Sequence, residues 1–526
     1  RKDIQGVDIG NEFGLVSLAR EVFYQIREGG RFSTSFSRTI NGNYARKKFQ
    51  LSLEELGICC PLLSIDHHLA HAASAYYSSG FEECLVLTLD GSGDELSHTT
   101  NIGRKGSIFR LASTSELFSP GIFYSAITKF LGYERHRHEG KITGLSAFGD
   151  PCQLYPFLQE VLCLSENKNS FSSRKNYNFS FFQKVRWSFR LFSNNYFRGL
   201  TTNYLLDLFE KKLSNEKSED IAAAAQKVLE DSTVELVKKA LADTGMQKIA
   251  LAGGVCGNVR LNQKISEIEG VEEIFICPNM GDGGCALGGA LHYFYHELKI
   301  SGETFQPQKL ENVYWGPEYT DDEIKSELLN IGLDFKLSDD VEEETAKYIA
   351  QGHVVGRFSG RMEYGPRALG NRSILVEALK EDISKILNTR LKRNDFMPFA
   401  PSILEEDATK YFNRLDYFSH TAEFMTISSN FKSIHHGAYP AVTHIDYSAR
   451  PHIVCKKNNP SFHKILSKYK EKTGVPLLLN TSFNAHENPI VCSPKDALNS
   501  LLQGCVDVLS IGNFIVFNPN IKVNNC

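Results

Sequence analysis

Three short apolar runs are the clearest feature of the hydrophobic pattern along the chain. They are "CLVLTLDGSGD" (Cys84–Asp94), "KIALAGGVCGN" (Lys248–Asn258) and "EIFICPNMGDGGCALGGAL" (Glu273–Leu291). Each begins as a buried strand and ends at glycines, and "GNVRLNQKISEI" after the second run is typical of a helix. A strand that ends at glycines and leads into a helix, repeated three times, predicts an α/β nucleotide-binding domain with ligands at the carboxyl ends of the strands.

A helical pattern precedes the first run. The stretch "SIDHHLAHAASAYY" (Ser64–Tyr77) holds three histidines and then an alanine-rich segment. His67 and His71 are one helical turn apart and leave the same face, whereas His68 is rotated away. Two imidazoles on one face can hold a divalent metal if carboxylates complete the shell. The spacing alone is equally typical of two exposed histidines at a helix start that Asp66 caps.

The rest of the pattern divides the chain. "EDIAAAAQKVLEDSTVELVKKAL" (Glu219–Leu241) predicts a long helix with an alanine face for close packing. Composition becomes acidic and turn-rich at "ENVYWGPEYTDDEI" (Glu311–Ile324), where we place the domain boundary, giving domains 1–312 and 313–526. Residues 160–215 are rich in Asn, Phe, Ser and Arg. They indicate an insertion whose aromatic residues pack on the first domain, with stacking on a base, a sugar or a partner as the alternative.

Bulk composition narrows the function classes. The chain has 526 residues, enough for two to four domains, with 42% hydrophobic and 23% charged residues. Its net charge of −4 indicates neither a nucleic-acid binder nor a membrane-surface protein, and no apolar run is long enough to span a membrane. Twelve cysteines without a C-x-x-C motif favour buried thiols in a reducing cytoplasm. The chain begins at Arg1 rather than Met, so we expect a missing upstream segment.

Carboxylates accompany the glycine turns. Asp90 and Asp282 are predicted in turns where backbone amides can approach a phosphate, and each could face that phosphate through a cation. Together with His67 and His71 they would form a mixed nitrogen and oxygen shell suited to iron, manganese or zinc. Ordinary turn aspartates are the simpler interpretation of each motif taken alone.

Arginines dominate the candidate chemistry of the second half. "GRFSGRMEYGPRALGNRSIL" (Gly356–Leu375) holds four arginines among glycines. Two further segments carry arginines, prolines and Ser or Asn donors, "RLKRNDFMPFAPSIL" and "PAVTHIDYSARPHIV". A third, "GVPLLLNTSFNAHENPIV", carries prolines with Ser and Asn donors. Guanidinium forks spread over several turns suit a small phosphorylated ligand, since acids balance them too well for nucleic acid. Structural salt bridges would explain one or two of these arginines.

At these residues the chain resembles a known family, the bacterial O-carbamoyltransferases of the nodulation-protein (NodU) and antibiotic-tailoring (CmcH, TobZ) type. The resemblance runs from about residue 60 to the end. It rests on motifs such as "DHHLAHAASAYY", "LTLDGSGD", "SPGIFYSAIT", "EGKITGLSAFG", "AGGVCGNVRLN", "GDGGCALGGA", "SGRMEYGPRALGNRSIL", "MPFAPSIL" and "LLLNTSFN". It implies an actin/hexokinase-like (ASKHA, threonylcarbamoyltransferase-like) N-terminal domain and a YrdC/Sua-like α/β C-terminal domain.

The resemblance also implies a mechanism in two steps. The C-terminal domain would make carbamoyl adenylate and pyrophosphate from carbamoyl phosphate and ATP. The N-terminal domain would transfer the carbamoyl group to a hydroxyl of a small molecule or glycan. The implied cofactors are ATP and a divalent metal, usually iron, with magnesium or manganese as alternatives.

Site residues follow from the matched motifs. The metal ligands would be His67, His71, Asp90 and Asp282, and the nucleotide site would include Asp90, Gly91, Gly253, Gly254, Asn258 and Asp282. The carbamoyl phosphate site would comprise Arg361, Arg367, Arg393, Arg450, Asn480 and Ser482. Candidates for the catalytic acid or base are His138, Glu139 and Lys141 in "HEGKITG".

The chain departs from the family pattern in four places. The first 65 residues show no counterpart of the usual opening strand and phosphate-facing turn. Tyr447 and Glu487 stand where the family usually has glycine, and His452 where it usually has glutamine. Two other functions are therefore kept open: a tRNA threonylcarbamoyl-type transferase, and a truncated, inactive nucleotide-binding homologue. The acceptor stays open, we expect no nucleic-acid or membrane partner, and a homodimer is compatible with the sequence.

Overall fold

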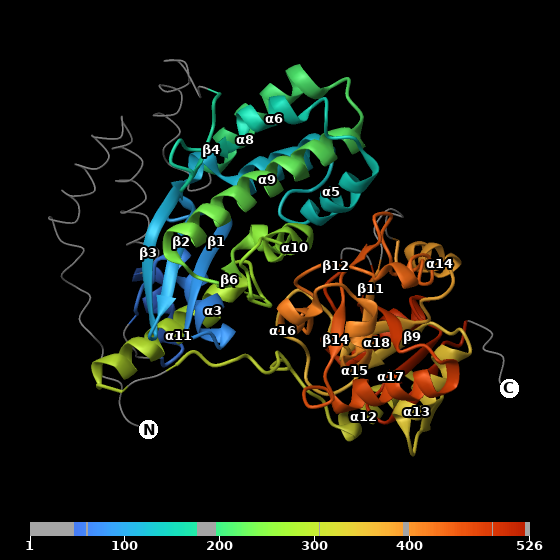
Figure 1. Cartoon of the computed structure of the whole chain (residues 1–526). Helices are drawn as coiled ribbons and strands as arrows, with labels where there is room; N and C mark the ends of the chain where they lie inside the picture. The colour runs from blue at the N-terminus through green and yellow to red at the C-terminus, as the bar shows by residue number, and fades with distance from the viewer. Residues whose placement is uncertain are drawn as a thin grey trace. The chain divides into compact units, whose positions relative to one another are not determined.

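The structure is a computed structural model that describes residues 47–58, 62–175, 196–303, 306–392, 399–485 and 488–520 (Figure 1). The chain divides into two compact units. One comprises Arg1–Asp66 and Lys175–Leu205, within which residues 47–55 are helical, and the other comprises His67–Arg174 and Leu206–Cys526. In the described part of the chain no helix is both long and apolar enough to cross a membrane.

The elements before residue 301 include the strands of a first sheet. In chain order they are α3 (His67–Ser79), β1 (Glu83–Gly93), β2 (Leu96–Arg104), β3 (Ser107–Ser115), η1 (Glu116–Phe118), α4 (Pro120–Phe130), α5 (Glu139–Leu145), η2 (Ser146–Phe148), α6 (Tyr155–Val161), β4 (Cys163–Leu164), β5 (Phe171–Ser172), α8 (Tyr196–Leu213), α9 (Ser218–Thr244), β6 (Lys248–Ala252), η3 (Gly254–Gly257), α10 (Val259–Ser266), β7 (Glu273–Ile276) and α11 (Gly283–Ile300).

The elements after residue 320 surround a second sheet. They are α12 (Asp321–Ile331), β8 (Phe335–Leu337), α13 (Val341–Ala350), β9 (Val355–Phe358), β10 (Arg372–Val376), α14 (Asp382–Arg390), β11 (Ala400–Leu404), α15 (Glu405–Tyr411), η4 (Leu415–Tyr417), α16 (Ser419–Ala422), β12 (Ser429–Asn430), η5 (Ser433–His435), β13 (Ser448–Ala449), β14 (His452–Val454), α17 (Pro460–Thr473), β15 (Leu477–Ser482), α18 (Pro494–Leu502), β16 (Val508–Ile511) and β17 (Phe514–Phe517).

The first sheet has the strand order β3-β2-β1-β6-β7, in which β1, β6 and β7 run parallel. The predicted strand-to-helix passages are confirmed after β6 and β7. The passage predicted after the first run is wrong, because β1 continues past Asp90 to Gly93 and pairs antiparallel with β2. Asp94 and Glu95 both have positive φ angles, 48° and 67°, and form the two-residue turn that joins these strands.

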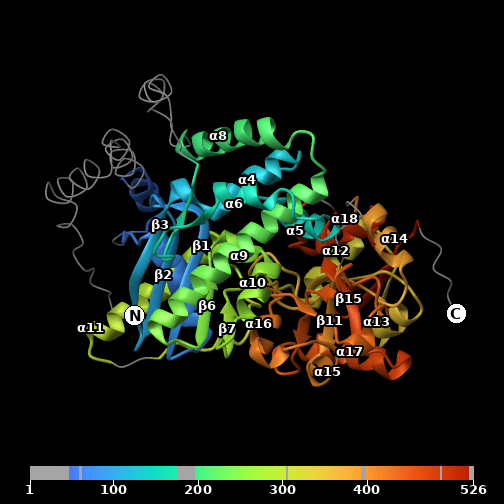
Figure 2. The same ribbon diagram turned by 45° about the horizontal axis from the view of Figure 1, so that its top comes forward.

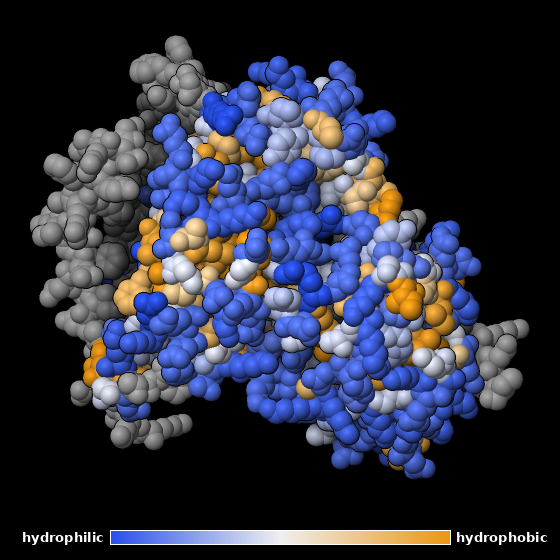
Figure 3. All heavy atoms as spheres, in the orientation of Figure 1, coloured by the Kyte–Doolittle hydropathy of each residue, from blue (hydrophilic) through white to orange (hydrophobic). Residues whose placement is uncertain are grey.

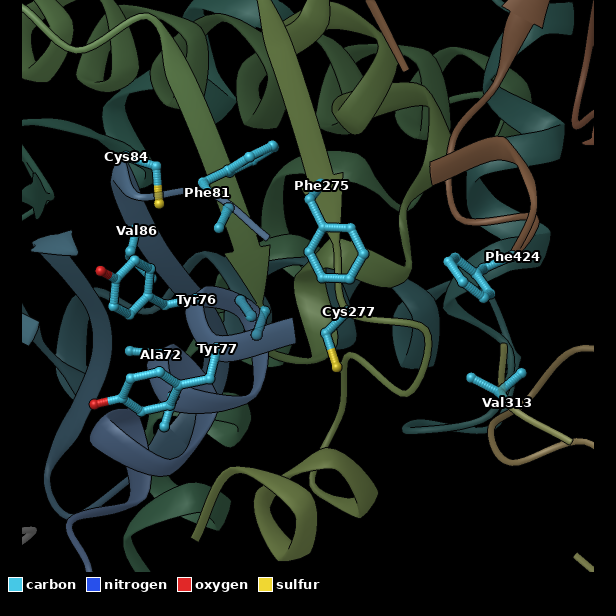
Figure 4. Packing of buried hydrophobic residues seen from close by; sticks show 14 of the residues in the cluster. Ala72, Tyr76, Tyr77, Phe81, Cys84, Val86, Phe275, Cys277, Val313 and Phe424 are labelled. Carbon is cyan, nitrogen blue, oxygen red and sulfur yellow. The ribbon is translucent and has the colours of Figure 1, made fainter. Parts of the chain in front are cut away.

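Both faces of β1, the central strand of the first sheet, are buried. On β1, Cys84 and Val86 belong to an apolar cluster with Tyr76 of α3 and Phe275 of β7 (Figure 4). The alternate residue Leu85 points to the opposite face and is also fully buried. Helix α3 contacts β1 and β6. Helices α4 and α9 contact β1 as well (Figure 2). The continuous apolar run of β1 is therefore the pattern of a strand covered on both sides.

The edge strand of this sheet is more exposed. Strand β3 lies beyond β2 and keeps Phe109 and Leu111 more than half exposed. Figure 3 shows apolar side chains over strands β1 to β3 on a face that is otherwise mostly hydrophilic.

The second sheet has eight strands in the order β14-β11-β15-β10-β9-β16-β17-β8. Strand β10 pairs antiparallel with both β9 and β15, and β11 pairs parallel with β14. Helices α13 and α17 pack on each other, and residues of both join the apolar cluster beside this sheet, together with Leu375, Leu478 and Val508.

Hydrogen bonds join the two sheet regions inside the second unit. Asn262 Nδ2 of α10 donates to the carbonyl of Thr426 at 2.7 Å, and Thr421 Oγ1 donates to the carbonyl of Ile274 at 2.7 Å. The apolar cluster of Figure 4 continues across the same contact through Val313 and Phe424. The two sheet regions therefore pack directly against each other, with contacts from α10, β7 and α16.

Candidate functional site

Two histidines meet at the start of helix α3, as their spacing predicts. The Nε2 atoms of His67 and His71 lie 3.1 Å apart. The His71 side chain is fully buried, and the His67 backbone amide donates to Asp94 Oδ2 at 2.7 Å, which fixes the start of the helix. His68 points elsewhere, with Nδ1 2.7 Å from Thr88 Oγ1 inside the sheet.

Two carboxylates complete the cluster from other elements. Asp90 Oδ2 on β1 lies 3.2 Å from His67 Nε2, and Asp282 Oδ1 at the N-cap of α11 lies 3.7 Å from both His67 Nε2 and His71 Nε2. Donor atoms of the four residues lie within 4.8 Å of one another. The predicted metal-ligand set is therefore brought together, and its two ring nitrogens and two carboxylate oxygens suit a divalent transition metal.

The electrostatics favour the charged carboxylates in this cluster. Burial alone would raise the pKa of Asp90, but the hydrogen bond from His67 and the backbone amide of Gly254, 2.9 Å from Asp90 Oδ1, hold it well below its usual value. The interaction with His71 likewise lowers the pKa of Asp282. The hydrogen bond to Asp90 raises the pKa of His67. The site thus concentrates negative charge that a cation can neutralise.

Two glycines are required by close approaches around Asp90. A Cβ atom on Gly93 would lie 2.0 Å from the His67 ring, so the strand could not pass the histidine with a larger residue. Gly253 has φ +100°, and its Cβ would lie 2.2 Å from the carbonyl of Leu89. Both positions therefore need glycine for space, and Gly253 also needs it for its backbone conformation.

The other predicted nucleotide residues lie around the same strand ends. The carbonyl of Gly91 accepts a hydrogen bond from Ser119 Oγ at 2.6 Å, which ties α4 to β1. Asn258 caps α10 by accepting from the Leu261 amide, and its Nδ2 donates to Gln226 Oε1 at 2.8 Å. Asn258 thus has a local structural role beside any contact with a nucleotide.

A cavity of about 370 Å³ lies within the second unit. One wall comes from residues 137–147 and from 257–260, and the other from the second sheet region. The residues that line it are Arg137, His138, Gly140, Lys141, Thr143, Gly144, Ala147, Gly257, Val259, Arg260, Pro366, Arg367, Ala368, Leu391, Phe399, Ala400, Met425, Ser428, His444, Ser448, Ala449, Arg450, Asn480, Thr481, Ser482 and Asn484. Its size suits a ligand of drug or nucleotide dimensions.

The lining is strongly cationic. It includes Arg137, Lys141, Arg260, Arg367 and Arg450, and no carboxylate belongs to the lining that the described residues form. Arg137 and Arg260 have acidic partners elsewhere, Glu134 and Asp446. A cavity of this kind attracts an anionic ligand.

Arg367 is the clearest anion-binding candidate in this lining. Its Nε is buried and has no hydrogen-bond partner among the described residues. No ion pair of Arg367 with another described residue is present. Burial lowers its pKa to about 10, so the guanidinium stays charged at neutral pH and is available to a ligand anion.

Comparison with known proteins places the chain. Its residues 25–291 match the family model described as the carbamoyltransferase N-terminus, and residues 346–518 match the carbamoyltransferase C-terminus. The chain belongs to the carbamoyltransferase family. It is therefore a transferase, and the N-terminal match begins at residue 25, earlier than the motifs near residue 60. The boundary predicted between residues 312 and 313 falls between the two matches and stays a prediction.

Individual relatives agree with this family. The chain is 34% identical over 460 residues to the nodulation protein NolNO of Sinorhizobium fredii, covering 86% of this chain and 63% of that protein. It is 34% identical over 474 residues to an uncharacterized protein of Methanocaldococcus jannaschii, covering 86% and 73%. It is 27% identical over 357 residues to the 3'-hydroxymethylcephem-O-carbamoyltransferase of Streptomyces clavuligerus, covering 67% and 60%.

Among solved structures, T. kodakarensis HypF aligns with 49% of this chain and 39% of its own at 16% identity and a TM-score of 0.27. A likeness this slight does not support a fold assignment. The fold is mixed α/β, and the finer ASKHA and YrdC/Sua architectures stay predictions.

The structure brings together most of the residues predicted for the carbamoyl phosphate site of this carbamoyltransferase. Arg367, Arg450, Asn480 and Ser482 all line the cavity. Arg361 does not, because its exposed guanidinium donates to the carbonyls of Trp315 and Gly316. Arg393 lies outside the described residues, as does Glu487. Most of the aromatic residues of the expected 160–215 insertion also fall outside them.

The three candidate catalytic residues separate. His138 and Lys141 line the cavity, so both face the space where a ligand would bind. Glu139 does not, because its Oε1 accepts hydrogen bonds from Ser125 Oγ at 2.9 Å and from the His136 amide at 2.7 Å. Glu139 therefore fixes the loop that carries His138.

Among the lining residues with cationic or imidazole side chains, sequence reasoning overlooked Arg137, Arg260 and His444. Arg137 and Arg260 stand inside motifs that were recognised, beside "HEGKITG" and within "GGVCGNVRLN". Their charge was the available signal. His444 lies in the recognised segment "PAVTHIDYSARPHIV", but its burial, which lowers its pKa to about 4, depends on tertiary packing.

Two of the four arginines in the Gly356–Leu375 motif are structural. Arg357 is buried and donates to the Gly370 carbonyl at 2.6 Å, while Arg372 donates to carbonyls of its own loop and stacks 3.7 Å above the Phe358 ring. They stabilise the loop that presents Arg367. Arg357 also donates to Asn371 Oδ1 and Ser461 Oγ, and neither arginine forms the anticipated salt bridge with another described residue. Arg372 Nε has no hydrogen-bond partner among the described residues.

The departures from the family pattern are accommodated locally. Tyr447 has φ +62°, the left-handed region that favours glycine, and its ring stacks on His436 at 3.9 Å rather than lining the cavity. His452 is buried, and its Nδ1 lies 2.8 Å from Ser402 Oγ, which in turn accepts from Asn480 Nδ2. His452 thus acts on the cavity through Asn480.

Proposed function

We propose that this chain is an ATP-dependent O-carbamoyltransferase that forms carbamoyl adenylate and then transfers the carbamoyl group to a hydroxyl. The observation that carries the proposal is the cationic cavity lined by Arg367, Arg450 and Asn480, to which the described residues contribute no carboxylate. Its anionic ligands would be carbamoyl phosphate and the phosphates of ATP. Family membership and the named O-carbamoyltransferase relative support the same chemistry.

The first step consumes carbamoyl phosphate, ATP and one water molecule, and it releases phosphate and pyrophosphate. Arg367 would bind phosphate oxygens through a guanidinium whose Nε is buried and has no hydrogen-bond partner among the described residues. The Asn480 side chain is almost fully buried, and its Oδ1 has no hydrogen-bond partner among the described residues. Oδ1 is therefore available to the amide of a carbamoyl group, which needs an acceptor.

The second step breaks the bond between the carbamoyl carbon and AMP and forms an ester-like bond to the acceptor oxygen. We propose that His67, His71, Asp90 and Asp282 hold a divalent metal, for which iron is the first candidate. When bound, the metal would stabilise negative charge on the phosphate leaving group. His138 and Lys141 are positioned to move the acceptor proton, because both face the cavity.

ATP–pyrophosphate exchange tests the first step. Purified protein should incorporate labelled pyrophosphate into ATP when carbamoyl phosphate is present and not when it is omitted. Exchange without carbamoyl phosphate, or none from folded protein, would contradict the proposed adenylation.

Measurement of bound metal tests the proposed metal site. His67→Ala should lower the metal affinity more than about tenfold, because a ring nitrogen at the centre of the cluster is lost. His138→Ala is the matched control, since His138 belongs to the cavity and to neither metal-donor group. Equal metal content in wild type and His67→Ala would contradict the ligand assignment.

A tRNA threonylcarbamoyl-type transferase is the second candidate, and no observation of the structure favours it. Threonine-dependent consumption of ATP by the purified protein, without carbamoyl phosphate, would support it instead.

A further inference from the structure

A cysteine thiol shares the histidine pair with the two carboxylates. Cys285 lies in the first turn of α11, three residues after Asp282. Its Sγ and one ring nitrogen from each of His67 and His71 lie within 4.8 Å of one another. The two histidines therefore belong to two donor groups at once, one completed by Asp90 and Asp282 and the other by Cys285.

The position of this thiol is set by rigid packing. Helix α11 packs against α3 so closely that a Cβ atom on Gly288 would lie 1.8 Å from the carbonyl of Ala70. A Cβ atom on Gly284, next to the cysteine, would lie 2.1 Å from the carbonyl of Asn279. Backbone atoms therefore lie directly against both glycines. The packing of α11 on α3 thus fixes the approach of Cys285 to the histidines.

The protonation state of Cys285 distinguishes metal coordination from simple packing of the thiol. Burial, with Asp282 and Asp90 nearby, raises the pKa of Cys285 to about 12, so without a cation the sulfur carries its proton. A coordinating divalent metal removes the proton from a thiol.

We propose that Cys285 is a thiolate ligand of the metal held by His67 and His71, so that this centre prefers thiophilic divalent metals such as zinc or cobalt over magnesium or manganese. On binding, the S–H bond breaks, a sulfur–metal bond forms and the proton leaves to solvent, so no oxidant is needed. The inference rests on the proposed metal site and adds a ligand that the sequence patterns did not indicate. Thiolate ligands select softer metals than carboxylates do.

Cobalt spectroscopy on the full chain tests the assignment. The metal-free protein is titrated with Co²⁺ alone, without ATP or carbamoyl phosphate. Wild type should show both the visible d–d bands of bound cobalt and a near-ultraviolet sulfur-to-cobalt charge-transfer band. Cys285→Ser should keep the d–d bands and lose the charge-transfer band.

Cys277→Ala is the matched control, because Cys277 is a buried thiol on the same approach to α11 and belongs to neither donor group. This variant should keep both sets of bands. A charge-transfer band that is absent from wild type or persists in Cys285→Ser overturns the assignment. If no d–d bands appear with wild type, the metal site and the cysteine ligand are overturned together.

A measurement without any substitution guards against misfolded variants. Zn²⁺ should slow the alkylation of Cys285 by iodoacetamide at least tenfold in the wild-type chain, while exposed Cys152 reacts at an unchanged rate. Equal labelling of Cys285 with and without bound zinc overturns the proposal. ATP–pyrophosphate exchange plays no part in either assay, so failure of adenylation and failure of this inference give different results.

Discussion

At the residue scale, hydrogen-bond partners and position distinguish the arginine proposed to bind a ligand from the arginines that stabilise a loop. Arg367 has a buried Nε without a partner and faces the cavity, whereas Arg361 satisfies two carbonyls at the surface. Both stand in one sequence motif, six residues apart, and the motif itself does not distinguish them.

This contrast gives a paired prediction. Arg367→Ala should lower kcat/KM for carbamoyl phosphate in the exchange reaction by about 10- to 100-fold, because charged hydrogen bonds to a phosphate contribute about 1.5–3 kcal/mol each. Arg361→Ala should leave exchange close to wild type. Equal losses in the two variants would show that the motif acts through its fold rather than through the cavity.

His452 gives a prediction about pH and stability. Burial lowers its pKa in the folded chain from 6.5 to about 3. As the pH falls below 6.5, the unfolded chain takes up a proton that the folded chain does not, so wild type loses stability down to about pH 3. Glutamine, the residue that the family usually has there, does not titrate.

His452→Gln should therefore be more stable than wild type by about 2 kcal/mol at pH 5, relative to the difference between the two at pH 7.5. Chemical denaturation at both pH values measures this change, and the pH 7.5 pair is the internal control. A difference that does not change with pH would mean that His452 is not held neutral.

At the element scale, the contact between α3 and α11 brings together the residues of the candidate metal site. Helix α3 supplies His67 and His71, and α11 supplies Asp282 and Cys285. The helices can approach because Gly288 and the alanine-rich face of α3 have little side-chain volume.

Gly288→Ala should therefore destabilise the chain by about 3 kcal/mol or more, because the added methyl group meets the backbone carbonyl of Ala70 and cannot be relieved by a rotamer change. Metal affinity should fall with it. Gly281→Ala, where a Cβ would meet nothing within 4 Å, is the control and should change the free energy of unfolding little. Similar losses at both positions would contradict this account of the helix contact.

At the scale of the whole molecule, the two candidate sites use different donors. The metal cluster draws on α3, β1 and α11, and none of its four residues lines the cavity. The cavity draws on both sheet regions of the second unit. In the proposed chemistry the arginines serve adenylate formation, whereas the metal serves carbamoyl transfer together with His138 and Lys141 of the cavity wall.

Asp282→Ala tests that division. The variant should keep carbamoyl phosphate-dependent ATP–pyrophosphate exchange within about threefold of wild type, yet lose metal and carbamoyl transfer to a hydroxyl by more than about tenfold. Asp282 is exposed at a helix start, so its loss leaves the core intact. Equal losses in the two assays would indicate a single shared site.

The sequence by itself determined the family, the strands β1, β6 and β7, the helix that carries His67 and His71, and which four residues form the candidate metal site. These depend on local features: periodicity, glycines at strand ends and residue spacing within a motif. Tertiary structure alone decided that β1 turns into a hairpin, because that depends on strand pairing beyond Asp94. It alone separated Arg367 from Arg361 and Arg357, since burial and partners come from distant segments. It also placed Cys285 beside the histidines, because only the packing of α11 on α3 sets that distance.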